Sequence, residues 1–582
     1  MLTALRSTAF AFAVALALGA QAQPDLRLPP PPPSPGEASP GGTPLVTDPA
    51  LASFANYTIY LRGTIPYYHA DAHRYDPAYI NPQGHSVFLD ARLGLSLNYP
   101  HEVSMRRTGP DKPHPVDIDD FAEFVATPPS RFEGADRGPP FMPPELLAYR
   151  WTVEDARRPE TYRATVLKMR GQGTIHYASF TLPKPGRYRV RLQVIFDGGR
   201  QGESVNEFEF REWFFVSLGD SSASGEGNPK RAGHPEPWSL ACEVTTQNLA
   251  IANEPNMAAE PEWAEPEAHR SWTSGPALAA KALNRVFAQT WSPSGSEDSK
   301  RLDFDKVIFA SFARSGAKTY TGLIASQKGA GDFIGAGQIE EARRTAAGRR
   351  IDVLMINIGG NDAGFSGVLK DLILENASVF RLYQVSDAGA RREAREKIEK
   401  FLGVNLPPGQ ESDFDGTLNA LRGQIETLRP SGLGDIYITG YPTGLFQYRR
   451  PDRTIGYRSC EIFRSRNFMN ISTADAEAIT QWGRLLNEAI KKKATEFGWR
   501  YIDVESDFEG RGYCAPGPDR YWVHAQESCR RQGDWDGTMH PNWKGHSAWG
   551  LRYSEAIRRH TFPFGPNRPI LPPPEDELAP VR

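Results

Sequence analysis

The segment WFFVSLGDS, residues 213–221, decides the fold. Its first six residues form a short, mostly apolar run, which is typical of a buried strand. Ser221 stands just beyond this run, and Gly225 and Gly227 follow it, so that a substrate can approach the backbone closely. The pattern predicts a strand that carries a serine at its carboxyl end, although Gly-Asp-Ser is by itself a common turn composition.

Similar short apolar runs recur along the rest of the chain, separated by segments with helical periodicity. The runs are KVIFASFA (306–313), IDVLMINIGG (351–360), DIYITGY (435–441) and RYIDVES (500–506). The helical patterns cover residues 275–289, 338–349, 418–428 and 474–497. Alternating strands and helices predict an α/β domain with a parallel sheet covered on both faces. We expect its active site at the carboxyl ends of the strands.

Two further motifs place chemistry-bearing side chains after predicted strands or in polar loops. Asn361 follows Gly359 and Gly360 at the end of the third strand, where a side-chain amide can donate to a developing oxyanion. His540 lies in the Gly-containing loop GDWDGTMHPN, a setting that suits an accessible base. His546 is a rival base, but it is expected to begin the last helix.

Together these motifs resemble the four sequence blocks of the SGNH/GDSL hydrolases, in the family's order. The blocks are GDS at 219–221, SGA at 315–317, GGND at 359–362 and HPN at 540–542. Four longer segments are also similar in sequence to the secreted esterase and lipase branch of that family. They are HRSWTSGPALAA, FASFARSGA, IGGNDAGF and MHPNWKGH. The resemblance covers about residues 213 to 562 and implies a three-layer α/β/α fold.

The resemblance also implies a role for each site residue. Ser221 attacks an ester carbonyl, and His540 takes its proton and later protonates the leaving alcohol. The backbone N–H groups of Ser221 and Gly316 and the side-chain amide of Asn361 hold the oxyanion. No metal or organic cofactor is needed, and the expected partner is an ester substrate.

The acid that orients His540 is where this sequence departs from its family. The family pattern usually places an aspartate three residues before the histidine, but that position is Gly537 here. Asp536, four residues before, is the predicted third member of a triad, and Asp534 is a poorer candidate. The alternative is that a backbone carbonyl of this loop accepts the Nδ1 proton instead of a carboxylate.

Residues 51–211 are predicted to form a β-rich domain before the hydrolase domain at 212–565. Tyr188, Val190, Leu192 and Val194 alternate with polar residues, which predicts a strand with one buried and one wet face. With the YRW motif at 149–151, this run resembles a PKD or other immunoglobulin-like β-sandwich. A family-specific β extension of the catalytic domain is the alternative.

The two ends of the chain are predicted to lie outside both domains. Arg6, an apolar run at 9–20 and Ala20-Gln21-Ala22 predict a signal peptide over residues 1–22, with a retained N-terminal anchor as the alternative. Pro-rich segments at 23–50 and 566–582 read as a linker and a tail. The mature protein is therefore expected outside the cytoplasm, in the extracellular space or the periplasm, without a transmembrane segment.

Export makes disulfides between the four cysteines plausible on chemical grounds. Four cysteines allow three pairings, and no CxxC spacing indicates structural zinc. Cys514 with Cys529 is the preferred bridge, because it closes one loop near the end of the chain. That choice leaves Cys242 with Cys460.

Composition limits the class of function further. The formal net charge of −3 provides no general attraction for nucleic acid or anionic membranes. Three functions remain: hydrolysis of lipid or other acyl esters, removal of acetyl groups from a polysaccharide, and binding on an inactive SGNH scaffold. The intact serine, glycine, asparagine and histidine argue against the third. An apolar tunnel would favour acyl chains, and a wide aromatic groove would favour sugars.

Overall fold

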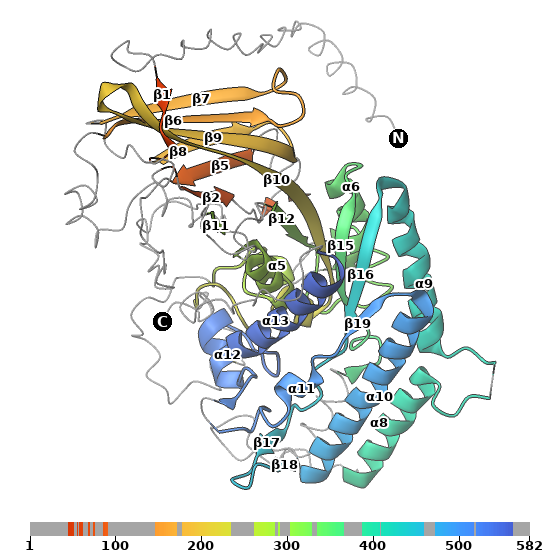
Figure 1. Ribbon diagram of the computed structural model, residues 1–582. Helices are drawn as coiled ribbons and strands as arrows, with labels where there is room; N and C mark the ends of the chain where they lie inside the picture. Colours follow the sequence, from red (N-terminus) through yellow and green to blue (C-terminus); the bar gives the residue numbers. More distant parts are fainter. Residues whose placement is uncertain are drawn as a thin grey trace, which may run out of the picture.

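The fold was taken from a computed structural model, shown as a ribbon in Figure 1. The structure describes residues 45–49, 51, 55, 57–61, 68–69, 74–75, 85–90, 146–170, 177–233, 242, 261–285, 289–291, 303–328, 334–365, 387–407, 409–458, 472–516 and 519–562. The predicted signal peptide, nearly all of the Pro-rich linker and the Pro-rich tail lie outside these residues. Among the described residues, no helix combines the length and the apolar character needed to cross a membrane.

Five parallel strands form the centre of the molecule. In spatial order they are β12 (Asp303–Ser311), β10 (Arg200–Gly219), β15 (Ile351–Asn357), β16 (Leu433–Thr439) and β19 (Arg500–Ile502). β10 is the first of these strands in the sequence, and the later strands β12 and β15 pair with its two opposite edges, so that the strand order reverses at β10. Such a reversal opens a crevice at the carboxyl ends of the strands, where ligands bind in open α/β sheets. The α/β prediction is confirmed.

Helices cover both faces of this sheet. They are α3 (Ser221–Ser224), α5 (Gly275–Arg285), α6 (Gln338–Ala346), α8 (Asp387–Leu402), α9 (Asp413–Ile425), α10 (Thr473–Phe497), α11 (Glu505–Phe508), α12 (Ala525–Gln532) and α13 (Trp543–His560). Short 3-10 helices occur at η4 (Asp197–Gly199), η5 (Pro266–Ala268) and η7 (Glu426–Ser431). The helices α5 and α13 lie side by side across one face (Figure 1).

Two apolar cores lie on opposite faces of the sheet. Along β10, Phe214 and Val216 belong to one core, whereas Phe215 between them belongs to the other. The first core includes residues of α6 and α9, and the second includes residues of α5 and α13. This alternation follows the period of two in a strand and produces the three-layer arrangement.

A second set of strands extends the central sheet on the N-terminal side. These strands are β9 (Gly186–Phe196), β6 (Leu146–Asp155) and β7 (Arg163–Met169), and each pairs antiparallel to its neighbour. On β9 the predicted apolar positions Tyr188, Val190, Leu192 and Val194 are all buried. The prediction of one buried and one wet face is confirmed, because Arg187 and Arg191 on the other face are exposed.

The strand β10 belongs to both parts of the molecule. Its residues 201–210 pair with β9, and its residues 215–219 pair with β15 along the same edge. Figure 1 shows this strand running without a break from the upper sheet into the central one. The expected boundary at residues 211 and 212 therefore falls inside a continuous strand.

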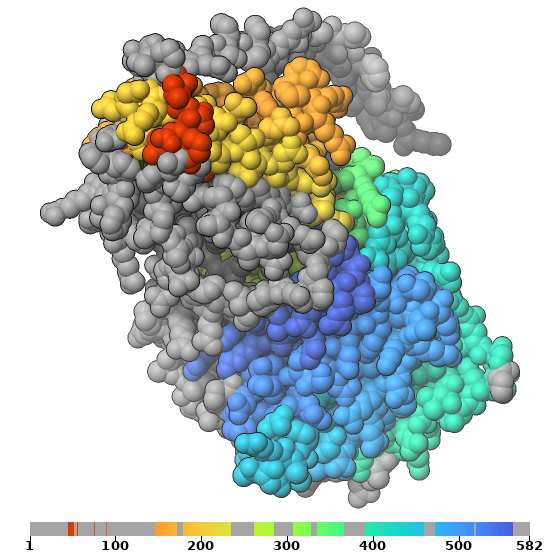
Figure 2. Space-filling view, viewed as in Figure 1, coloured from red at the N-terminus to blue at the C-terminus, as the bar shows by residue number. Residues whose placement is uncertain are grey.

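A smaller sheet packs against the N-terminal extension. It consists of β11 (Gln289–Trp291), β2 (Tyr57–Leu61), β5 (His85–Asp90) and β8 (Tyr177–Leu182). Leu89 and Phe180 of this sheet share a core with Trp151 of β6 and Leu192 of β9. The two sheets thus form a sandwich at one end of the molecule, and the coloured atoms of Figure 2 place β6, β7 and β9 at that end. The likeness to a PKD domain stays a prediction.

The remaining strands are short. They are β1 (Val46–Thr47), β3 (Tyr68–His69), β4 (Arg74–Tyr75), β13 (Gln327–Lys328), β14 (Ile334–Gly335), β17 (Gln447–Arg449) and β18 (Ile455–Tyr457). β1 pairs in parallel with the beginning of β10. Tyr75 of β4 reaches the central sheet, because its buried hydroxyl accepts a hydrogen bond of 2.7 Å from the N–H of Ser311.

The disulfide pairing differs from the prediction. Cys242 is bonded to Cys529, 287 residues away in the sequence, so the bridges Cys514–Cys529 and Cys242–Cys460 are both wrong. The segment after α3 passes along α12, where the Gly233 N–H donates to the Arg531 carbonyl at 3.0 Å. That contact brings the chain beside Cys529. Cys514 is also disulfide-bonded, and Cys460 lies outside the described residues.

Breaking the Cys242–Cys529 bridge should lower the thermal stability of the protein. A disulfide between distant residues restricts the unfolded chain, and such bridges typically contribute about 2–4 kcal/mol to the free energy of unfolding. Thermal melts of Cys242→Ser and Cys529→Ser should show a lower Tm than wild type, by similar amounts in both variants. Mass mapping of the oxidised protein should recover linked peptides containing Cys242 and Cys529, and a Cys514–Cys529 peptide would contradict the pairing.

Candidate active site

The turn that carries Ser221 is built by the end of β10. The backbone of Gly219 has a φ of 154°, and a Cβ there would lie 2.4 Å from the Asn357 carbonyl oxygen, so the close approach requires glycine. Asp220 then caps α3 by accepting a hydrogen bond of 3.0 Å from the Ser222 N–H. Ser221 is therefore the first residue of a short helix at the carboxyl end of the central strand.

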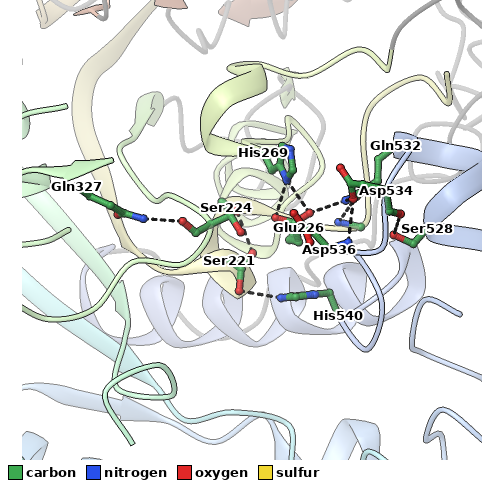
Figure 3. Close-up of polar contacts among 12 residues, drawn as sticks. Ser221, Ser224, Glu226, His269, Gln327, Ser528, Gln532, Asp534, Asp536 and His540 are labelled. Carbon is green, nitrogen blue, oxygen red and sulfur yellow. Dashed lines mark hydrogen bonds and ion pairs between the residues drawn. The ribbon is translucent and has the colours of Figure 1, made fainter. Parts of the chain in front are cut away.

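Ser221 and His540 face each other across the crevice, as Figure 3 shows. The Ser221 Oγ and the His540 Nε2 are 2.8 Å apart. Two backbone hydrogen bonds to Val523 hold the His540 loop, one from the Val523 N–H to the His540 carbonyl and one from the Met539 N–H to the Val523 carbonyl. Burial of the imidazole lowers the pKa of His540 below 6.5, so the ring is neutral at pH 7 and can accept a proton.

The structure does not bring the Asp536 carboxylate to the Nδ1 atom of His540. Within the described residues Nδ1 is buried without a hydrogen bond of normal geometry, although the Thr538 backbone is close enough to raise the pKa of the ring. Asp536 is exposed, and its own N–H donates to Asp534 Oδ1 at 2.8 Å. Contrary to the prediction, the loop with its extra residue forms no hydrogen bond from Asp536 to this nitrogen. The alternative with a backbone carbonyl fits better.

Replacing Asp536 with asparagine should therefore reduce kcat by less than tenfold. A triad aspartate that binds the imidazole contributes about 10⁴-fold, because its loss also inverts the tautomer. Asp536 makes no such bond, and it influences His540 only through its charge. Steady-state kinetics of Asp536→Asn on one soluble ester would test this. A loss of three orders of magnitude would restore Asp536 as a triad member.

The two predicted oxyanion residues come from neighbouring loops. Gly316 follows β12 with a φ of 72°, a left-handed conformation that favours glycine. Asn361 follows β15, and its side-chain Nδ2 donates to the Ala317 carbonyl at 3.0 Å. The GGND block thus contacts the SGA block directly. Both loops lie at the carboxyl ends of strands that flank β10, on the same edge of the sheet as Ser221.

A half-buried tyrosine supports the turn that carries Ser221. The Tyr441 hydroxyl donates a short hydrogen bond to the Asp220 carboxylate and accepts one of 2.9 Å from the Gly360 N–H. Burial raises the pKa of Asp220 to about 7. Tyr441 was missed by the sequence reasoning, because nothing in ITGY distinguishes a supporting hydroxyl from an ordinary aromatic at the end of a strand.

A second polar cluster lies beside His540, and of its members only the two aspartates were predicted as site candidates. It consists of Glu226, His269, Gln532, Asp534 and Asp536, which Figure 3 shows on the side of Ser221 away from Gln327. Glu226 is completely buried and binds His269 through Nδ1 at 2.8 Å. Neither Glu226, between Gly225 and Gly227, nor His269, at the start of HRSW, is distinguished by the sequence, because sequence alone does not show that the two segments meet.

Part of this cluster has the composition of a cation site. Ligand atoms of His269, Asp534 and Asp536 all lie within 4.8 Å of one another. The pairing with Glu226 overcomes burial and raises the pKa of His269 to about 9, so the ring is protonated at neutral pH and has no lone pair for a metal. We therefore assign no metal to it. The expectation that catalysis needs no cofactor stays a prediction.

His546, the rival base, lies inside α13 and is completely buried. Burial, together with the nearby His540, lowers its pKa from 6.5 to about 3. Among the described residues, the His546 ring forms no hydrogen bond to Ser221. This agrees with the interpretation of His546 as a residue of the first helical turn rather than as the base. Because His546 is buried as a neutral ring, its protonation makes the free energy of unfolding depend on pH.

As the pH is lowered, the free energy of unfolding of the wild type should decrease more steeply than that of the His546→Gln variant. Unfolded His546 takes up a proton below pH 6.5, whereas the folded ring stays neutral to about pH 3. Its contribution is therefore complete above pH 6.5 and is lost as the pH falls, by about 1.4 kcal/mol per pH unit. Denaturant unfolding at pH 6.5 and 4.5 should show about 2 to 3 kcal/mol more loss in wild type. Equal losses would contradict the burial of a neutral ring.

A serine hydroxyl within hydrogen-bond reach of a neutral imidazole, at the carboxyl end of a parallel sheet, is the arrangement of a serine hydrolase. Residues 215–552 match the family model described as GDSL-like Lipase/Acylhydrolase, and the chain belongs to this family. The protein is thus a carboxylic ester hydrolase, and the resemblance drawn from the four sequence blocks is confirmed.

Several solved structures are similar to this chain at low identity. An extracellular lipase from Streptomyces rimosus is 19% identical over 60% of this chain and 100% of that one, with a TM-score of 0.34. A phospholipase A1 from Streptomyces albidoflavus NA297 is 18% identical over 60% and 98%, with a TM-score of 0.33. An acetylxylan esterase from Geobacillus stearothermophilus is 12% identical over 61% and 95%, with a TM-score of 0.24. No curated protein matches the chain.

Proposed function

We propose that the protein is a secreted serine esterase that cleaves lipid or other acyl esters through a covalent acyl-enzyme. The observation that carries this proposal is the separation of 2.8 Å between Ser221 Oγ and His540 Nε2. A hydroxyl so placed can pass its proton to the imidazole as the oxygen attacks the ester carbonyl. His540 then returns the proton to the leaving alcohol, and water repeats the two steps to release the acid.

The oxyanion that forms during attack is proposed to be held by three donors. They are the N–H groups of Ser221 and Gly316 and the side-chain amide of Asn361. The Ser221 N–H belongs to the first turn of α3, where backbone donors have no partner within the helix. The hydrogen bond from Asn361 to the Ala317 carbonyl fixes the amide beside the Gly316 loop. Preorganised donors of this kind stabilise charge that develops only in the transition state.

Secretion is supported by the redox chemistry of the cysteines. A disulfide joins Cys242 to Cys529, and such bridges persist in oxidising compartments. The apolar run near the N-terminus, with its small residues at 20 and 22, supplies the expected export signal.

The proposal is tested with wild-type protein and two measurements. A fluorophosphonate probe should label one serine, and mass mapping should place the adduct on Ser221. A panel of p-nitrophenyl esters from acetate to palmitate, run beside acetylated xylan, then identifies the substrate class. We expect longer acyl esters to be cleaved. Release of acetate from xylan alone would favour the carbohydrate esterase, and failure of all substrates and of labelling would leave an inactive scaffold.

A further inference from the structure

Glu226 is a buried carboxylate on the same turn as the nucleophile. Its N–H donates to the Ser221 carbonyl at 3.1 Å, directly after the left-handed Gly225 that ends α3. The side chain of Glu226 is completely shielded from solvent. A carboxylate buried to this degree is unfavourable unless charged partners or hydrogen bonds satisfy it. Its position five residues after Ser221 ties those partners to the catalytic turn.

The partners of Glu226 come from three other segments of the chain around the site. His269 Nδ1 lies 2.8 and 2.9 Å from its two oxygens, and Gln532 Nε2 donates to Oε1 at 2.7 Å. Ser315, the residue before Gly316, lies close enough to Glu226 to lower the pKa of this carboxylate further. Gln532 in turn accepts a hydrogen bond of 3.0 Å from the Gly227 N–H. One carboxylate thus connects the Ser221 turn, the Gly316 loop and the segment leading to His540.

The Glu226–His269 pair is charged at neutral pH. Burial by itself would raise the pKa of Glu226, but His269 and the hydrogen bonds lower it to about 2. Burial by itself would lower the pKa of His269, but Glu226 raises it to about 9. The imidazole is also fixed mechanically, because its ring stacks on Trp263 with centroids 5.1 Å apart. The negative charge is therefore permanent and fixed in place.

This charge acts on His540. The charged groups that affect the His540 pKa are Glu226 and Asp536, which raise it, and His269, which lowers it less than Glu226 raises it. The neutral ring of His546 lies nearby. No carboxylate among the described residues binds His540 Nδ1. Asp536 is exposed to solvent, which screens its charge, whereas Glu226 is fully buried.

We infer that Glu226 is a positioning residue of the proposed ester hydrolysis: its buried carboxylate, fixed by His269 and Gln532, stabilises the His540 imidazolium through space. The inference rests on the proposed roles of Ser221 and His540. In a Ser-His-Asp triad this task belongs to an aspartate that binds the imidazole directly. Here the carboxylate follows the nucleophile in sequence and acts without contacting the ring through a hydrogen bond.

The experiment compares Glu226→Gln with wild type across pH. The substitution keeps the shape of the side chain and removes its charge, so protonation of His540 becomes less favourable. We expect kcat/KM at the plateau to fall by about tenfold to a hundredfold. We also expect the acid limb of the kcat/KM profile to move by about one unit to lower pH. The rate of fluorophosphonate labelling at Ser221 should show the same two changes without depending on the choice of ester.

A matched control is Glu265→Gln. Glu265 is equally buried and forms an ion pair with Arg270 in the loop that carries His269. Its loss should lower Tm without moving the acid limb. If Glu226→Gln does not fold, the double variant Glu226→Gln/His269→Gln replaces the ion pair with two neutral amides. It should show a shift in the same direction, smaller because the opposing charge of His269 is removed as well.

Each outcome decides between the alternatives. An unchanged acid limb in Glu226→Gln or in the double variant, with or without a loss of rate, would overturn the inference and leave Glu226 a structural residue. A wild type that neither hydrolyses esters nor reacts with the probe would instead overturn the proposed function. The two failures are therefore distinct, because the first requires an active wild type.

Discussion

Replacing Ser221 with alanine is expected to abolish ester hydrolysis, with a loss in kcat of about five to six orders of magnitude. The Ser221 hydroxyl is the atom that faces His540 Nε2, and alanine offers no nucleophile in its place. The fold should be retained, because the residue begins a short helix and alanine is well tolerated in helices. Initial rates on a p-nitrophenyl ester, with circular dichroism and Tm measured on the same sample, would test both expectations.

Ser222→Ala provides the matched control for this experiment. Ser222 is the next residue of the same turn, and its backbone N–H, which alanine retains, forms the hydrogen bond to Asp220. We expect kcat within a few fold of wild type and no loss of probe labelling. An active Ser221→Ala variant would end the serine-hydrolase interpretation, whereas inactivity of both variants would indicate damage to the turn rather than loss of the nucleophile.

Replacing Asn361 with alanine is expected to reduce kcat by about 10²–10³-fold, with a smaller effect on KM. The reason is that an oxyanion donor binds charge that exists in the transition state and not in the bound ester. Asn361→Asp has nearly the same volume but carries an acceptor and a negative charge in place of the amide donor. Its loss should be at least as large.

Full kcat and KM determinations on all three proteins separate the alternatives for Asn361. A change confined to KM would make the residue a substrate-binding group. The hydrogen bond from Asn361 to the Ala317 carbonyl predicts some loss of stability in the alanine variant as well. Tm should therefore be measured beside the kinetics, so that a partly unfolded sample is not mistaken for a catalytic defect.

The sequence predicted the central sheet well, and it placed Ser221 and His540 in loops that do meet in the structure. Apolar runs that end in glycine turns identify parallel strands, and the four blocks fall at the ends of those strands. Contacts that depend on three-dimensional packing were not predictable in the same way. Glu226 and His269 are 43 residues apart, and only the folded loops bring them together.

The two errors have the same physical origin. The Cys514–Cys529 bridge was preferred because the residues are close in sequence, yet the entropy of closing a loop grows only slowly with its length. The packing of the Gly233 segment on α12 therefore decided in favour of Cys242. For Asp536, a shift of one position leaves the carboxylate in the cluster with His269 and without a hydrogen bond to His540 Nδ1. Spacing within a loop predicts direction only when the backbone conformation of the loop is known.

The long strand β10 has a consequence for how the chain assembles during synthesis. Its 20 residues span roughly 66 Å, far beyond an ordinary strand. β9 and β10 are joined only by η4, whereas 30 residues that include β7 and β8 separate β6 from β9. All of these strands precede the remaining strands of the hydrolase sheet in the sequence, so this antiparallel part can form before those segments leave the ribosome. The C-terminal half of β10 is then available to pair with β12 and β15 in the correct register. We expect the N-terminal region to act as the nucleus on which the catalytic sheet grows, rather than as a removable module.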